Sequence, residues 1–192
     1  TIEAVRDNVP LTYFEFGTLA AFLVLSRANC DAWVIEVGLG GRLDATNILE
    51  PTVSIITNIA LDHQEWLGDT LEEIAIEKSG IIKPSIPVVY GEESMHKIVS
   101  EIANNNESEL FTGGINFFLN HENQECSWNG INEKITNIIT PDNWGPGEYQ
   151  NLATALSAIE LINIDILPKR EELNEVLEKF YSPGRFEEIK KD

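Results

Sequence analysis

The most informative stretch of the sequence reads Glu36-Val37-Gly38-Leu39-Gly40-Gly41-Arg42-Leu43-Asp44-Ala45-Thr46-Asn47. It continues a short apolar run, residues 32–37, that we expect to form a buried strand. Glycines let a backbone approach a ligand closely, and a carboxylate at a strand end can bind a hard cation such as Mg²⁺. The pattern is neither a phosphate-binding loop ending in Gly-Lys-Ser/Thr nor a dinucleotide fingerprint. From these residues alone, a tight turn capped by Asp44 or Asn47 is as good an interpretation as a ligand site.

The segments around this stretch predict a parallel sheet flanked by helices. Upstream, residues 14–28 read as an apolar helix, with Thr12 as its N-cap and Glu15 completing a capping box. Downstream, strands are predicted over residues 53–59 and 87–90, and helices over residues 70–82 and 94–103. Alternating strands and helices at this spacing are typical of α/β proteins, whose ligands bind beyond the carboxyl ends of the strands.

The pattern changes after a polar spacer at residues 104–107. Residues 111–139 consist of short alternating runs separated by glycine and asparagine, which predict an antiparallel hairpin or small meander. Helical patterning returns over residues 149–162 and 169–181. The fold class that we predict is therefore α/β, with a mostly parallel sheet and a small antiparallel β insertion at about residues 105–140.

Two further clusters carry side chains that are capable of chemistry. Asp62 and His63 directly follow the strand predicted over residues 53–59. A neutral imidazole can bind a metal, although a lone histidine in such a place is more often structural, and Asp62 can instead orient His63. Lys78 falls near the apolar side of its predicted helix, where it either extends to water or is kept for phosphate contact or modification.

Composition excludes several classes of protein. The formal net charge is −19, which repels nucleic acid. Hydrophobic residues make up 43% and charged residues 23%, close to the average of globular proteins. No apolar run approaches the ~20 residues of a membrane span, and we see no secretory signal pattern. The two cysteines offer neither a disulfide framework nor a metal-ligand spacing, so we expect a reducing, cytoplasmic setting and no membrane partner.

The three clusters, taken in order, resemble a known enzyme family. The motif EVGLGGRLDATN at residues 36–47 is followed by ITNIALDHQEWLGDTL at 56–71 and IAIEKSGIIKP at 74–84. These look like the central signatures of the bifunctional folylpolyglutamate/dihydrofolate synthases of the Mur ligase superfamily. The match is dense over residues 11–91. It returns in GEYQN at 147–151, where Tyr149 occupies a position that is often histidine in the family, and in SPGRFE at 182–187.

The resemblance implies an ATP-dependent ligase. In this family ATP converts a carboxylate into an acyl phosphate, which the amine of glutamate then attacks. By resemblance, Glu36 and His63 bind Mg²⁺, and Lys78, carbamylated, helps to bind a second Mg²⁺; Lys78 and His63 are then the catalytic residues. Asn151 would contact the nucleotide and Arg185 the phosphates. The implied partners are ATP, L-glutamate and folate or dihydropteroate, in a monomer. Mg²⁺ would offset the repulsion between these anions and the acidic protein.

We expect the chain to be part of a longer enzyme. Residues 1–187 would form an incomplete ATP-binding domain of the Mur ligase central type, and residues 188–192 the start of a linker to a C-terminal domain. The family's phosphate loop and its glutamate-binding segment would lie outside the chain, so we expect no activity from the chain alone. Dihydrofolate synthesis and polyglutamate extension both remain open. The alternatives are another amino-acid ligase of the superfamily and a non-catalytic α/β interaction domain.

Overall fold

The computed structural model describes residues 1–122 and 125–180. Its central layer is a parallel sheet of β1 (Ser54–Ile56), β2 (Val88–Tyr90) and β3 (Leu110–Thr112), in the order β1-β2-β3. The strands pair in register, with Val88 opposite Ser54 on one side and Leu110 on the other. Every residue of β2 is buried, as expected of the middle strand of a parallel sheet. The predicted α/β class is confirmed.

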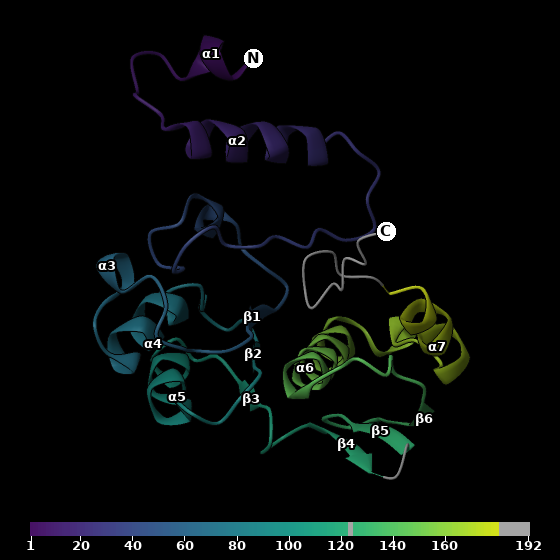
Figure 1. The fold of residues 1–192 in the computed structure, drawn as a ribbon. Coiled ribbons are helices and arrows are strands. Elements are labelled where there is room, and N and C mark those ends of the chain that lie inside the picture. Colours follow the sequence, from purple (N-terminus) through teal and green to yellow (C-terminus); the bar gives the residue numbers. More distant parts are fainter. Residues whose placement is uncertain (123–124, 181–192) are drawn as a thin grey trace, which may run out of the picture.

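Helices α4 (Leu71–Ser79) and α5 (His96–Asn105) pack against each other beside this sheet (Figure 1). Helix α4 begins at a capping box that the sequence analysis did not single out, in which the Thr70 hydroxyl accepts a hydrogen bond from the Glu73 N–H at 3.2 Å. One core cluster unites both helices with β2 through fully buried side chains that include Ile74, Tyr90 and Val99. The short helix α3 (Gln64–Leu67) precedes α4 and contributes the buried Leu67.

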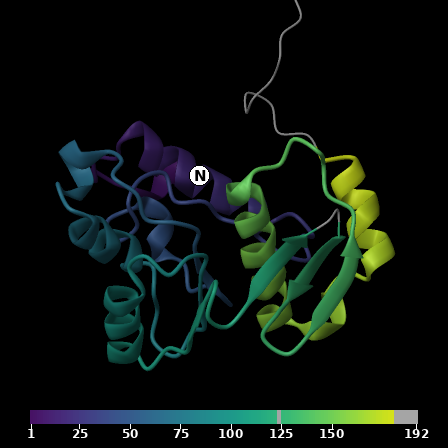
Figure 2. The same cartoon turned by 60° about the horizontal axis from the view of Figure 1, so that its bottom comes forward.

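A second layer lies on the other side of the parallel sheet (Figure 2). Strands β4 (Phe118–Glu122), β5 (Glu125–Asn129) and β6 (Lys134–Ile138) form the predicted antiparallel meander. Helix α6 (Pro146–Ile162) contacts both β2 and β4, and α7 (Arg170–Glu178) contacts β6. The short 3₁₀ helix η2 (Ile164–Ile166) connects α6 to α7. Helix α6 therefore joins the two sheets.

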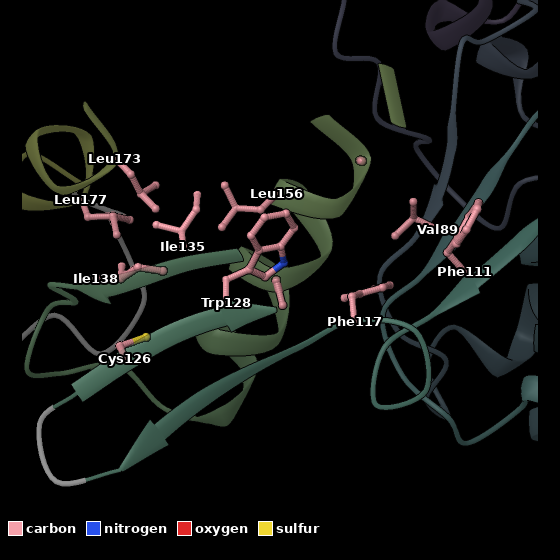
Figure 3. Close-up of a cluster of buried hydrophobic side chains, with 12 residues drawn as sticks. Val89, Phe111, Phe117, Cys126, Trp128, Ile135, Ile138, Leu156, Leu173 and Leu177 are labelled. Atoms are coloured by element: carbon pink, nitrogen blue, oxygen red, sulfur yellow. The ribbon is translucent and has the colours of Figure 1, made fainter. Parts of the chain in front are cut away.

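The core of this second layer is built around Trp128 (Figure 3). Its indole is fully buried, and its N–H donates to the Ser157 hydroxyl at 3.3 Å. Cys126 on the same strand is also buried. The other buried members of this cluster come from the parallel sheet, the meander and the last two helices, and they are Val89, Phe111, Phe117, Ile135, Ile138, Ala153, Leu156, Ala158, Leu173 and Leu177.

The buried carboxylate of Glu160 joins α6 to the meander by hydrogen bonds. It accepts hydrogen bonds from the backbone N–H groups of Ile131 at 2.9 Å, Asn132 at 2.6 Å and Glu133 at 3.0 Å. These donors lie in the turn between β5 and β6, where no strand partner can satisfy them. A buried acid is therefore stabilised by hydrogen bonds rather than by a cation.

Two of the predicted strands differ from the structure. Residues 32–37 run extended, but they form no strand, because no described segment pairs with them. Val34 is 96% exposed, so the run is also not buried. Residues 110–112, whose last two we assigned to the meander, instead form β3 of the parallel sheet. Apolar runs this short do not reveal which sheet they will join.

The segment before residue 45 packs loosely. Helix α1 (Ile2–Val5) and helix α2 (Tyr13–Leu25) precede the glycine-rich stretch, which leads into the 3₁₀ helix η1 (Ala45–Ile48). Helix α2 extends across one end of the molecule, and Thr18 is its only buried residue (Figure 1). Among the residues that the structure describes, no helix is both long and apolar enough to cross a membrane.

Candidate active site

Asp44 organises the glycine-rich loop from within. Its carboxylate accepts hydrogen bonds from the N–H groups of Gly38 at 3.0 Å and Leu39 at 3.2 Å. Its other oxygen accepts from the Thr46 N–H at 2.8 Å, which caps η1. The capped turn that the sequence allowed is therefore present. It leaves the backbone of the loop in one defined conformation, as a ligand-binding loop requires.

The loop rests on the C-terminal end of α4. The Arg42 N–H donates to the Glu77 carbonyl at 2.9 Å, and the Arg42 guanidinium pairs with the Glu77 carboxylate at 2.7 Å. A Cβ added at Gly41 would lie 2.9 Å from the carbonyl oxygens of both Glu77 and Lys78. Gly41 is thus required by close packing, which brings the loop against the helix turn that carries Lys78.

Asn47 and Lys83 extend this contact between the first and third motifs. The Asn47 amide donates to the Gly80 carbonyl at 2.9 Å, and the Lys83 ammonium donates to the Asn47 carbonyl at 2.7 Å. Both bonds join positions more than thirty residues apart. The two motifs therefore form one structural unit.

The second motif touches the same loop. Gly40 has a φ of +68°, and a Cβ there would lie 2.8 Å from the Leu67 side chain. His63 adopts the left-handed conformation immediately before α3, and its N–H donates to the Asp62 carboxylate at 2.8 Å. The Asp62 carboxylate also lies 3.6 Å from His63 Nε2, which agrees with the orienting role that the sequence allowed for Asp62.

The three candidate metal-binding residues lie on these connected segments. Glu36 is exposed, the His63 side chain is 59% exposed, and Lys78 is half-buried. Among the described residues, no hydrogen bond or ion pair engages the Lys78 ammonium. The expectation that Glu36 ends a paired strand is wrong, because residues 32–37 pair with no strand of the described part of the chain. No three His, Cys, Asp or Glu side chains in the described ranges form a metal-binding group by themselves.

The backbone directly after β1 lies close to the backbone directly after β2 and to the first turns of α6. A Cβ at Gly91 would lie 2.3 Å from the Thr57 carbonyl oxygen, so only glycine fits there. The Gln150 amide donates to the same carbonyl at 3.5 Å. Asn151, the candidate nucleotide contact, follows Gln150 on α6 and is exposed. Arg185 lies outside the described residues.

Tyr149 lines a hollow at the start of α6. The hollow has a volume of about 500 Å³ and is also lined by His121, Asp142 and Trp144. The Tyr149 ring stacks on His121, with ring centres 4.6 Å apart. Tyr149, at the position where the resemblance leads us to expect histidine, packs against the meander.

Sequence reasoning missed Glu92. Its carboxylate accepts hydrogen bonds from the Ile59 N–H at 2.7 Å, the Ser94 hydroxyl at 2.8 Å and the Tyr90 hydroxyl at 3.3 Å. Glu92 follows β2, so the rule that drew attention to residues beyond Val37 and Ile59 would also have drawn attention to it.

Comparison with known proteins places this arrangement in a family. Residues 7–153 match the model of the Mur ligase middle domain. The dihydrofolate synthase/folylpolyglutamate synthase of Escherichia coli is 34% identical over 186 residues, which are 97% of this chain and 43% of that relative. The chain thus spans less than half the length of this relative.

Solved structures agree with the sequence match. E. coli FolC in complex with DHPP and ADP has a TM-score of 0.86 and 32% identity, covering 98% of this chain and 44% of that one. A bifunctional folylpolyglutamate synthase/dihydrofolate synthase with Mn, AMPPNP and L-glutamate bound has a TM-score of 0.85 and 36% identity, covering 98% and 45%. The resemblance read from the three motifs is confirmed. The chain belongs to the Mur ligase family through its middle domain, and the relatives that it resembles are folylpolyglutamate/dihydrofolate synthases.

Proposed function

We propose that the chain is the middle-domain part of an ATP- and Mg²⁺-dependent ligase that adds L-glutamate to a folate or dihydropteroate carboxylate. The observation that carries the proposal is the joining of three motifs around one glycine-rich loop, seated against the helix turn of Lys78. The similar structure that holds Mn, AMPPNP and L-glutamate supports a metal, a nucleotide and an amino acid as ligands. The whole reaction belongs to the longer enzyme, and we propose that this chain alone is inactive.

The residues present fit a divalent cation with oxygen and nitrogen ligands. Glu36 supplies a carboxylate and His63 an imidazole, and both side chains are exposed and accessible to an ion. Carbamylation, in which the deprotonated Lys78 amine adds to CO₂ and releases a proton, would give an anionic oxygen ligand. A bound Mg²⁺ would neutralise charge on the phosphoryl group during transfer.

The proposed reaction has two steps, which pass through an acyl phosphate. The substrate carboxylate attacks the γ-phosphorus of ATP and releases ADP. The glutamate amine then attacks the acyl carbon, phosphate leaves, and the amine loses a proton. In this scheme Asn151 contacts the nucleotide and Arg185 the phosphates. The proposed setting is the cytoplasm, which the free thiols of Cys30 and Cys126 support.

The test is Mg²⁺-dependent ATP turnover with glutamate and either dihydropteroate or a tetrahydrofolate. The chain alone is compared with a form extended at both ends to the length of its relatives. We expect turnover only in the extended form, and the preferred pterin separates the two synthase activities. Absence of turnover and of Mg²⁺-dependent nucleotide binding in both forms would refute the proposal and favour the interaction-domain alternative.

Variants in the extended form test the residue assignments. Glu36→Gln, His63→Ala and Lys78→Ala are each expected to lower activity or metal affinity by at least the roughly 10- to 100-fold that loss of a residue supporting a metal ligand costs. Lys97→Ala is the matched control, because Lys97 is an exposed lysine on the neighbouring helix α5. Equal activity of Lys78→Ala and Lys97→Ala would remove Lys78 from the site.

A further inference from the structure

We infer that Glu92 is a positioning residue, which fixes the loop of residues 57–63 and thereby the cation site to which His63 contributes. The inference rests on the proposed function of His63. It adds a residue that lies in none of the three motifs and that contacts the loop from the segment directly after β2.

Glu92 anchors the beginning of the loop. Its carboxylate oxygen lies 2.7 Å from the Ile59 nitrogen, a short charge-assisted hydrogen bond. Ile59 itself is 5% exposed, so water has little access to this backbone group. Without the carboxylate, the N–H would lose its partner in a place where an unpaired donor is costly.

The carboxylate is itself held in place. The Ser94 hydroxyl donates to it at 2.8 Å and the Tyr90 hydroxyl at 3.3 Å. Tyr90 accepts a further hydrogen bond from the Met95 N–H at 3.2 Å. The Tyr90 hydroxyl is protonated at neutral pH, as in an ordinary tyrosine, and burial raises its pKa further. The end of β2 thus provides a preorganised acceptor for Ile59.

The end of the loop has its own anchor. The His63 carbonyl accepts hydrogen bonds from the N–H groups of Trp66 at 2.9 Å and Leu67 at 3.0 Å, in the first turn of α3. Residues 60–62 between the two anchors are exposed and have few contacts of their own. The path of the backbone into His63 is therefore set by its two ends, Ile59 and the start of α3, and loss of the Glu92 contact would release one of these ends. Metal ligands must be placed to within about 0.5 Å.

The experiment measures Mn²⁺ affinity of the extended protein in the presence of AMPPNP, together with hydrogen exchange of residues 57–63. We expect Glu92→Ala to weaken Mn²⁺ binding by about tenfold, as the loss of a supporting residue does at other metal sites, and to speed exchange in the loop. Glu92→Gln keeps an acceptor oxygen and should bind nearly as well as the unaltered protein. Glu101→Ala, which removes an exposed acid of α5, is the control for net charge.

Two comparisons separate failure of the inference from failure of the proposed function. Unchanged Mn²⁺ affinity in Glu92→Ala, with loss in His63→Ala, overturns the inference and leaves the proposed function standing. Unchanged affinity in His63→Ala overturns the metal role of His63, and the inference with it. If Glu92→Ala does not fold, Glu92→Asp is the variant that tests the inference. It keeps the negative charge, but its shorter side chain places the carboxylate farther from the Ile59 N–H. We expect weaker binding in Glu92→Asp, and unchanged binding would again overturn the inference.

Discussion

Helices α2 and α4 both begin with a threonine–glutamate capping box, but they differ in how much of each helix is buried. In both, a threonine hydroxyl accepts a hydrogen bond from the backbone N–H three residues on, and that glutamate's side chain returns the bond. The two cap distances, at Thr12 and Thr70, are both 3.2 Å. Helix α4 buries Ile74, Ala75 and Ser79, whereas α2 buries only Thr18. Capping therefore determines where a helix starts, while burial depends on what lies opposite it.

The largest expected difference between the two helices is the loss of stability when an apolar side chain is shortened to alanine. Ile74 is fully buried and Leu19 is 37% exposed. Ile74→Ala leaves a cavity and should cost about 2–5 kcal/mol of unfolding free energy, while Leu19→Ala should cost far less. Urea unfolding of the two variants measures the difference. Equal losses would show that α2 is packed as tightly as α4.

Two glycines should respond to alanine in opposite directions. At Gly41 a Cβ meets backbone oxygens at 2.9 Å, so Gly41→Ala should destabilise the chain by about 1–3 kcal/mol. Gly17 lies within α2, and a Cβ added there would meet nothing within 4 Å apart from its chain neighbours and the nearby backbone of its own helix, so Gly17→Ala should stabilise that helix by about 0.5–1 kcal/mol. Thermal unfolding monitored by circular dichroism gives both signs. A stabilising Gly41→Ala would contradict the close seating of the loop on α4.

The two caps provide a smaller contrast. Thr70→Ala should lower global stability by about 1 kcal/mol, because α4 unfolds together with the core. Thr12→Ala should mainly loosen the first turn of α2. Hydrogen exchange is expected to show faster exchange across the core for Thr70→Ala and only local change for Thr12→Ala. A global effect of Thr12→Ala would mean that α2 is coupled to the core.

The smallest effect is a dependence on pH. Hydrogen bonds from Thr12, first from its backbone N–H and then from its hydroxyl, lower the pKa of Glu15 below its ordinary value of 4.5. The folded pKa is depressed, so this stabilisation is present above pH 4.5 and is lost as the pH falls through the folded pKa. We expect the start of α2 to fray on acidification, with a Glu15 midpoint below 4.5 in an NMR titration. A midpoint at 4.5 would show that the cap is not formed in solution.

Much of the fold was predictable where the signal is local. The capping box at Thr12 marked the start of α2 correctly, the helical pattern that begins at residue 70 contains α4, and the apolar runs at residues 53–59 and 87–90 contain β1 and β2. Helix α6 begins at Pro146, earlier than predicted, because proline is well suited to a first helical turn. The strand predicted at residues 32–37 failed because strand formation requires a partner, which the sequence of the run cannot supply.

The candidate site was predictable as motifs but not as geometry. The sequence indicated which segments carry chemistry, and the contacts of Gly40 and Gly41 show that these segments meet. The sequence allowed a turn capped by Asp44, but it could not show that Glu92 would contact Ile59 from the end of the neighbouring strand. A contact of this kind joins distant positions and leaves no periodic pattern. The metal-binding roles of Glu36, His63 and Lys78 stay predictions.

The different burial of the two thiols makes the chain selectively reactive. Burial raises the pKa of the Cys126 thiol to about 11, so at neutral pH only about one molecule in ten thousand carries the reactive thiolate there. Cys30 is exposed on the stretch between α2 and the glycine-rich loop. A maleimide dye should therefore label the native chain at Cys30 alone, without any mutation. The dye would lie next to residues 32–37, which pair with no strand among the described residues, and its fluorescence would report when another polypeptide covers that run.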